Sequence, residues 1–365
     1  MFRPDRDLPD PAAVAAACAA LAAAAPRTQI EGPWRSGALA ALARAGLLAG
    51  FIPASCGGGG AREPALLAAL AAIAERCLTT ALAVTQWASA VRLIASGSAD
   101  LQAALLPALA RGETFVTVGI SQLTTSRQHT PPALTASRDE RGWRLDGLCP
   151  WVTGADAVDA IVTGAVTVDG EPLFFVVPAR AEGVHVEPPL DMLALSGSRT
   201  SAVRFAAARV AAAIPRPSGG TRTGGLATTA LALGATRAAL AVLAAEAAAR
   251  PFLAPVAAGF AAEAAALAAG LASATADTAH AAAPADRERL RADANGLVVR
   301  VSQAALAASK GAGFVRGHPA ERLAREALFF LVWSCPQAVT SLISGSLSLL
   351  TASKAEPNKY PTLAT

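Results

Sequence analysis

The composition of the chain changes twice along its length, and this alternation constrains its fold more than any single motif. Up to Gly112 the sequence consists of Ala- and Leu-rich stretches with helical spacing. From Glu113 to Pro215 it is richer in Thr, Val and Ile and is divided by turn signals such as Asp169-Gly170. Long Ala-rich stretches then return. Because Ala favours helices and short β-branched segments favour strands, we expect an α+β chain of three domains in the order helical, β, helical.

The first expected domain, residues 1–112, is entirely helical. A Gly-rich run, Gly57–Gly60, lacks the Lys-Ser/Thr that follows a phosphate-binding loop, and we interpret it as a turn. Start and stop signals predict five helices, over Asp10–Ala25, Trp34–Leu48, Glu63–Cys77, Thr79–Ser96 and Ala99–Ala110.

The second expected domain, residues 113–215, holds short strands. Their spacing is typical of a small antiparallel β-barrel or sandwich of about 100 residues. The predicted strands are Thr114–Ser121, Ala133–Ser137, Trp143–Leu148, Ala160–Val168, Leu173–Val177, Val184–Glu187, Thr200–Phe205 and Arg209–Ala213.

The third expected domain, residues 216–365, is a four-helix bundle. Four long helical stretches separated by short Pro- or Gly-containing connections favour antiparallel packing, and their Ala content allows a close approach. They are Leu226–Ala249, Pro255–Ala282, Ala285–Gly311 and Ala320–Leu350.

Composition and charge exclude several classes of function. The net charge of +4 includes no run of basic residues interleaved with aromatics, so we expect no nucleic-acid partner. The four His have no i,i+4 spacing and the five Cys form no CxxC pair, so we expect no metal site and free thiols in a reducing compartment.

We also expect no membrane span. The N-terminus, MFRPDRDLPD, is charged and is unlike a signal peptide. The apolar stretch Pro255–Ala276 is mostly Ala with Glu263 inside it, and Ala has too little transfer energy to favour insertion. A cytoplasmic protein is the expectation.

Five short motifs occur in a fixed order along the chain. They are Ser121–Ser126 (SQLTTS), Trp151-Val152-Thr153, Leu195–Val210 (LSGSRTSAVRFAAARV), Arg250-Pro251-Phe252 and Lys310–Phe314 (KGAGF). In this order they resemble the acyl-CoA dehydrogenase superfamily of flavoproteins, from roughly Trp34 to Leu350. The resemblance implies that superfamily's fold, an FAD cofactor, and a substrate such as acyl-CoA or a carrier-bound acyl group. It also implies a homodimer or homotetramer, since family members pack their bundles together.

The resemblance assigns roles to residues of this chain. Trp151 would stack on the isoalloxazine ring, and Thr153, two residues further along a strand, would point the same way and hydrogen-bond near flavin N5. The expected cofactor contacts are Ile120, Ser121, Ser126, Trp151, Thr153, Arg250, Phe252 and Gly311. The expected substrate contacts are Thr125, Phe330, Trp333 and Ser334.

The chain departs from the family where the catalytic base is expected. Dehydrogenases of this family use a Glu to remove the substrate α-proton, and gap-free counting places Ser334 at that position. The alternative base region in other branches, Thr223–Thr229, contains no acid either. A Ser without an adjacent base is too weakly acidic to replace a carboxylate, and Cys335 would need a cationic neighbour to become a thiolate. The catalytic base therefore stays unassigned.

Nearby residues have simpler interpretations. Glu321 and Glu326 are expected to be surface residues or ion-pair partners of Arg322 and Arg325. Pro336 is expected to kink or end its helix. The Gln residues with which the family grips FAD are replaced here by about Ala307 and Phe260, which weakens that grip.

Three functions remain open from the sequence. The first is a dehydrogenase-type FAD oxidoreductase acting on an acyl thioester or a related small organic substrate. The second is a flavin monooxygenase or oxidase on the same fold, which needs no carboxylate base. The third is a non-catalytic acyl-binding subunit.

Overall fold

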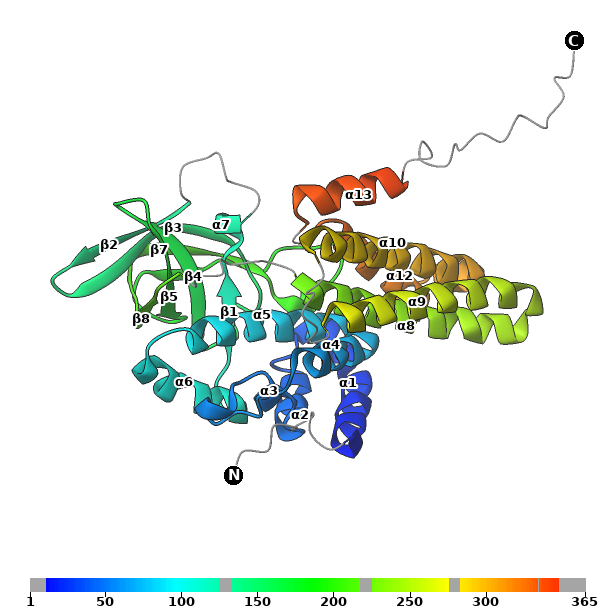
Figure 1. The fold of residues 1–365 in the computed structure, drawn as a ribbon, viewed down its shortest axis with the longest axis horizontal. Coiled ribbons are helices and arrows are strands. Elements are labelled where there is room, and N and C mark those ends of the chain that lie inside the picture. The colour runs from blue at the N-terminus through cyan, green and yellow to red at the C-terminus, as the bar shows by residue number, and fades with distance from the viewer. Residues whose placement is uncertain (1–10, 125–132, 217–224, 276–282, 334, 348–365) are drawn as a thin grey trace, which may run out of the picture.

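A computed structural model describes residues 11–124, 133–216, 225–275, 283–333 and 335–347 of the chain (Figure 1). Two groups of helices and a β-sheet make up this part of the molecule. In Figure 1 the sheet lies at one end, the long bundle helices extend to the other, and the N-terminal helices run beneath both.

The N-terminal helices follow the sequence prediction with two main differences. The first helix continues past the expected end at Ala25 to Glu31. The single helix expected over Trp34–Leu48 is divided, because Gly46 adopts φ 72° between its two halves. The observed elements are α1 (Pro11–Glu31), α2 (Ala38–Arg44), α3 (Leu47–Gly50), η1 (Ala54–Cys56), α4 (Glu63–Arg76), α5 (Leu78–Ala95) and α6 (Ala99–Arg111).

The middle of the chain forms one sheet of eight strands in the order β6-β7-β3-β2-β4-β5-β8, with β1 paired to β4. Most pairs are antiparallel, as expected, but β1 and β2 both pair in parallel with β4. The strands are β1 (Val116–Gly119), β2 (Leu134–Asp139), β3 (Gly142–Val152), β4 (Ala160–Thr167), β5 (Pro172–Pro178), β6 (Val184–Val186), β7 (Ser201–Arg209) and β8 (Ala212–Ile214), with α7 (Ser121–Thr124) and η2 (Ser196–Ser198) between them.

The central residues of strands β4 and β5 are buried on both faces, which explains why both strands are mostly apolar. Phe174 and Val176 contribute to a core shared with the N-terminal helices, whereas Phe175 and Val177 contribute to a separate core inside the β region. Successive side chains of a strand point to opposite faces, so β5 supplies both cores.

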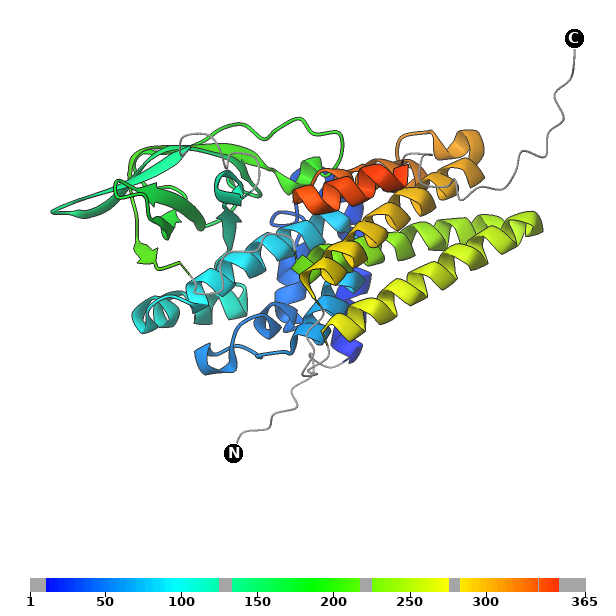
Figure 2. The same cartoon turned by 45° about the horizontal axis from the view of Figure 1, so that its top comes forward.

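The C-terminal helices form a bundle whose central helix packs on the N-terminal region. Helix α8 packs against α4, α9 and α10 (Figure 2). The elements are α8 (Gly225–Ala249), η3 (Pro251–Leu253), α9 (Ala254–Ala274), α10 (Pro284–Ala308), α11 (Lys310–Gly313), α12 (Pro319–Ala327), η4 (Leu328–Leu331) and α13 (Gln337–Leu347). The last expected helix, Ala320–Leu350, is broken before α13, where Pro336 was predicted to interrupt it.

Two adjacent bundle helices are equally apolar but unequally buried. Among the described residues, three helices are long and apolar enough to cross a membrane by length and composition alone, namely Ala12–Glu31, Gly225–Ala249 and Pro251–Ala274. The structure buries 67% of the most apolar window of Gly225–Ala249 but only 6% of that of Pro251–Ala274. Helix α9 therefore presents an Ala-rich face that the described part of the chain does not cover.

Candidate functional site

The indole of Trp151 lies exposed at a β-bulge near the end of β3. Cys149 pairs with Val203 and Val152 with Ser201, so Pro150 and Trp151 together face one residue of β7. Cys149 and Val152 are both fully buried, whereas Trp151 is 53% exposed. A bulge redirects a side chain, and a Pro without an N–H is tolerated there. The bulge therefore turns the large apolar ring outward, where a flat ligand can stack on it.

Thr153 follows the end of β3 instead of continuing it. The simple i,i+2 relation expected between Trp151 and Thr153 does not hold, because the register shifts between Cys149 and Val152. Thr153 is 7% exposed, and its Oγ1 lies 3.2 Å from the Oγ1 of Thr200. We call Trp151–Thr153 the shelf, a surface with an exposed aromatic ring and a nearly buried hydroxyl.

The segment after β1 is tied to the strand that carries the shelf. The Nε2 of Gln122 donates to Gly119 O (3.3 Å), Thr163 Oγ1 (3.1 Å) and Gly164 O (2.9 Å). Its Oε1 accepts from the thiol of Cys149 at 3.1 Å. An ionised carboxylate in place of this amide could not donate these bonds, so the amide suits this site. Sequence analysis did not identify this role, because the partners are spread over three strands.

The hydrogen bonds of Gln122 hold the backbone that follows two predicted cofactor contacts. Ile120 and Ser121 precede it at the start of α7 and are partly exposed. Burial raises the pKa of the Cys149 thiol to about 12, so this thiol stays protonated and serves only as a donor. The predicted contacts Thr125 and Ser126 lie outside the described residues.

The segment Phe330–Trp333, which we call the wall, is held by two side chains of α10. The Nδ2 of Asn295 donates to Phe330 O at 2.8 Å, and the Nη2 of Arg291 donates to Trp333 O at 2.9 Å. Both α10 residues are buried and lie one helical turn apart. They satisfy carbonyls that are left open where η4 ends.

The predicted substrate contacts on the wall differ in exposure. Phe330 is fully buried in the main core, and its carbonyl, not its ring, is the part held by α10. The ring of Trp333 is partly exposed and stacks on Phe329 with 5.0 Å between centroids. Ser334, which gap-free counting predicts at the position of the family's base, lies outside the described residues.

The two carboxylates of α12 are engaged in ion pairs, as predicted. Arg325 Nε lies 2.6 Å from Glu321, and Arg322 Nη1 lies 3.0 Å from Glu326. The hydrogen bond from Arg325 lowers the pKa of Glu321. Glu326 is buried, contrary to a surface position, and burial raises its pKa although Arg322 opposes this. Since the Nε2 of Gln29 also donates to Glu326 at 3.2 Å, this carboxylate is held between α1 and α12.

Cys335 has the cationic neighbour that the sequence did not reveal. Arg291, far away in the chain, lies close enough to hydrogen-bond to its thiol and lower its pKa. Burial outweighs that effect, so the pKa of Cys335 is raised overall. The thiol donates weakly to Trp333 O at 3.5 Å and therefore belongs to the support of the wall.

The remaining predicted cofactor residues meet at the end of the bundle farthest from the sheet (Figure 1). The guanidinium of Arg250 donates to Glu246 and to the carbonyl of Ala308, which joins the end of α8 to the end of α10. Phe252 is exposed just after Arg250, and Gly311 has open space around it. The structure thus brings Arg250, Phe252 and Gly311 together, but not to the shelf of the same chain.

Comparisons with known proteins agree with this architecture. Residues 12–113 match the family "Acyl-CoA dehydrogenase, N-terminal domain". Butyryl-CoA dehydrogenase from Megasphaera elsdenii aligns with a TM-score of 0.76 at 17% identity, covering 94% of this chain and 99% of that one. TdsC from Paenibacillus sp. A11-2, in complex with FMN and indole, aligns with a TM-score of 0.71 at 20% identity, covering 87% and 92%.

A third similar structure is KijD3 in complex with FMN and a dTDP-linked amino sugar. It aligns with a TM-score of 0.69 at 21% identity, covering 93% of this chain and 94% of that one. A search of curated proteins found no match. The chain therefore carries an acyl-CoA dehydrogenase N-terminal domain over residues 12–113, and its described part has the acyl-CoA dehydrogenase fold.

The sequence predicted that two FAD-binding glutamines of the family are replaced here, near Phe260 and Ala307. Phe260 packs in the bundle, and the guanidinium of Arg300 lies 5.8 Å from its ring centroid. Ala307 is exposed near the end of α10. Neither position offers the amide contact that the family uses.

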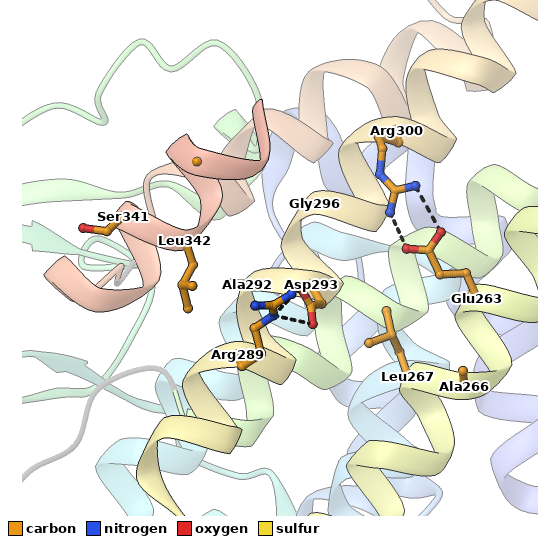
Figure 3. A pocket seen from close by; sticks show the side chains of 11 residues that line it. Glu263, Ala266, Leu267, Arg289, Ala292, Asp293, Gly296, Arg300, Ser341 and Leu342 are labelled. Atoms are coloured by element: carbon orange, nitrogen blue, oxygen red, sulfur yellow. Dashed lines mark hydrogen bonds and ion pairs between the residues drawn. The ribbon is translucent and has the colours of Figure 1, made fainter. Parts of the chain in front are cut away.

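A groove of about 650 Å³ lies on the bundle, and none of the predicted site residues that the structure describes lines it (Figure 3). Two ion pairs, Arg300–Glu263 and Arg289–Asp293, line it on α9 and α10. Both pairs are largely exposed and already satisfied, so we assign no ligand to this groove. Within the described ranges, no three His, Cys, Asp or Glu side chains are grouped to hold a metal ion.

Proposed function

We propose that the chain is a flavin-dependent oxidoreductase acting on an acyl thioester or a related small organic substrate. The observation that carries this proposal is the shelf, where a bulge exposes the Trp151 ring beside the nearly buried Thr153 hydroxyl. The exposed indole leaves apolar area in water, and a ligand ring stacked on it would remove that area from water.

The residues of the shelf suit a flat heteroaromatic ring. Trp151 would cover one face of an isoalloxazine, Thr153 would offer a hydroxyl at its edge, and Ile120 and Ser121 would border its polar end. When bound, a flavin supplies hydride or electron transfer. The protein would contribute binding, orientation and the exclusion of water, and Trp333 on the wall would bound the substrate.

We propose FAD as the cofactor, in keeping with the family motifs. The matched TdsC and KijD3 structures carry FMN, and the apolar Phe260 and Ala307 weaken the grip expected on an adenine nucleotide. Releasing the flavin by heat and identifying it by chromatography tests this choice. FMN as the single released flavin would contradict it.

A second candidate is a monooxygenase or oxidase on the same fold. The observation that favours it is the sequence Trp333–Gln337, which contains no acid. On the neighbouring α12, Glu321 and Glu326 are both bound to arginines. A reaction that removes an α-proton needs a base with a pKa near the working pH, whereas a reaction with oxygen does not.

The visible spectrum of the purified protein is the first test. A bound flavin gives absorption bands in the visible range, and bleaching by an acyl-CoA without oxygen supports the dehydrogenase. Reoxidation after chemical reduction that yields a hydroperoxide-type spectrum supports the monooxygenase. A colourless protein that takes up neither FAD nor FMN would reject both and leave an acyl-binding subunit.

The variant Ser334→Glu tests the proposed position of the missing base. If this position faces the substrate as in the family, the carboxylate should introduce or raise acyl-CoA dehydrogenation. Ser341→Glu, on α13, is a matched control that adds the same group away from the wall. A folded, flavin-loaded Ser334→Glu protein with no gain over this control would contradict the assignment.

We further propose a cytoplasmic homodimer or homotetramer. The Ala-rich face of α9, with exposed Ala258, Ala262, Ala265 and Ala269 one to two turns apart, supports an interface between copies. Light scattering measures the mass in solution, and cell fractionation tests the location. A monomer found with the membrane fraction would contradict both statements.

A further inference from the structure

A row of three hydroxyl groups leads from the shelf into the protein. Thr153 Oγ1 lies 3.2 Å from Thr200 Oγ1, which lies 2.8 Å from Ser198 Oγ. All three residues are buried, with Thr153 at the outer end and Ser198 fully enclosed. The row connects the end of β3 to the loop that surrounds η2.

Each hydroxyl in the row has one hydrogen to donate and two lone pairs. If Ser198 donates to Thr200 and Thr200 donates to Thr153, the hydrogen of Thr153 remains available for a group in front of the shelf. Such chains also polarise each other, so each donor becomes stronger. Without Thr200, the Thr153 hydroxyl loses the partner that fixes its orientation.

The loop that carries Ser198 and Thr200 is held in place by its backbone. Leu195 and Arg199 flank η2 with φ of 62° and 49°, a conformation that such side chains rarely adopt. Residues kept in this region concentrate at functional sites, where the surrounding structure imposes them. The N–H of Gly154, next to Thr153, donates to Ser198 O at 2.9 Å, which gives the loop a second link to the shelf.

Two further contacts anchor this loop to the rest of the molecule. A Cβ on Gly197 would lie 1.9 Å from Thr28 O, so the loop touches the end of α1 directly. The Nε of Arg199 donates to both oxygens of Asp156, at 2.9 and 2.8 Å. The loop is therefore a fixed support behind Thr153.

We infer that Thr200 and Ser198 are positioning residues, which orient the Thr153 hydroxyl toward the edge of a flavin on the shelf. This inference rests on the proposed function. Neither residue touches the cofactor; both act through Thr153.

Thr200→Val tests the inference, because it keeps the side-chain shape and removes the hydroxyl. The readout is the ratio of oxidised to reduced flavin at equilibrium with a reference dye. A hydroxyl donated to flavin N5 stabilises the oxidised ring, so Thr200→Val should shift this ratio toward reduced flavin by about 3- to 10-fold. Thr200→Ser should resemble the wild type, and Ser198→Ala should shift the ratio in the same direction by a smaller factor.

Two controls separate this role from a structural one. Thr236→Val removes a buried hydroxyl of α8 that donates to Ala232 O, and it should leave the ratio unchanged. In a Thr153→Val background, Thr200→Val should not change the flavin ratio further, because Thr200 acts only through the Thr153 hydroxyl, which is then absent. Thermal unfolding and flavin content are recorded for every variant.

Each outcome decides the inference. A Thr200→Val ratio equal to that of wild type, or a shift that persists in the Thr153→Val background, would overturn it. If Thr200→Val does not fold, Ser198→Ala in the same assay decides in its place. A wild-type protein that binds no flavin would instead remove the proposed function, which keeps the two failures distinct.

Discussion

The shelf, proposed to contact the flavin, and the wall, proposed to contact the substrate, are supported in different ways. The shelf rests on backbone geometry, namely the bulge of β3 and the constrained loop at η2. The wall rests on two individual side chains of α10, Arg291 and Asn295, which hold its carbonyls. A support built from backbone contacts is disturbed mainly where a substitution adds atoms that displace the backbone, whereas one built from two side chains weakens when either side chain is removed.

The end of α1 contacts the supports of both regions. Thr28 O meets Gly197 behind the shelf, and the adjacent Gln29 donates to Glu326 on the helix that leads to the wall. Two neighbouring residues thus link the η2 loop to α12. Substitutions there test how far the two regions depend on each other.

The largest effect is expected from Gly197→Ala. The new Cβ would overlap Thr28 O, so either the loop or α1 must move, at a cost of about 3 kcal/mol in the free energy of unfolding. Gly197→Ala should also weaken flavin binding, because the displaced loop supports Thr153. Denaturant unfolding measures the first effect, and Gly259→Ala, with open space in α9, should instead stabilise the fold by about 0.5–1 kcal/mol. A neutral Gly197→Ala would show that the loop is not fixed against α1.

Trp151→Ala should come next. Loss of the stacked ring is expected to weaken flavin binding by about 1.5–2 kcal/mol, roughly 10- to 30-fold, with little effect on folding because the ring is exposed. Titration of the apoprotein with FAD measures it. Trp333→Ala, on the wall, should alter substrate-dependent rates and leave flavin affinity nearly unchanged. Equal losses of flavin affinity in both variants would contradict the separation of the two regions.

Arg291→Met should have a moderate effect confined to the wall. It removes a charged hydrogen bond to Trp333 O, but it also relieves the desolvation of the buried guanidinium. We therefore expect the free energy of unfolding to fall by only about 1–2 kcal/mol. Arg289→Met is the matched control, because Arg289 pairs with Asp293 at the surface. Loss of this exposed pair should lower the free energy of unfolding by only about 0.3–0.5 kcal/mol. Chemical denaturation compares them, and equal destabilisation would argue against the support of the wall by Arg291.

The smallest effect is a pH dependence at Glu326. Burial raises its pKa in the folded state above the ordinary 4.5, so its ionisation opposes folding. Its contribution to stability therefore increases as the pH falls through the folded pKa and is complete below about 4.5. The difference in melting temperature between Glu326→Gln and wild type should be more favourable to the variant at pH 7 than at pH 4.

Glu321→Gln should behave in the opposite sense. Arg325 lowers the pKa of Glu321, so its ionised form contributes stability at pH 7 that is lost as the pH falls below 4.5 through the folded pKa. The variant should be less stable than wild type at pH 7 and approach it at low pH. Parallel pH profiles for the two variants would contradict both assignments.

Local patterns in the sequence predicted much of this molecule. The order of helices and strands, the interruption near Pro336 and the i,i+4 pairs of α12 all follow from residues close together in the chain. The motif at Trp151 and Thr153 was likewise visible, because its residues are adjacent. Helical spacing and turn chemistry act over a few residues, and a sequence displays them directly.

Tertiary structure alone decided how these parts support each other. The bulge that exposes Trp151 depends on the register between β3 and β7, and Thr200 meets Thr153 only because that pairing forms. Arg291 reaches Trp333 across 42 residues of sequence. Contacts between distant segments depend on register and packing, which the local pattern of a chain does not specify. The sequence by itself therefore indicated a shelf for a flavin, and only the fold determined what holds the Thr153 hydroxyl beside it.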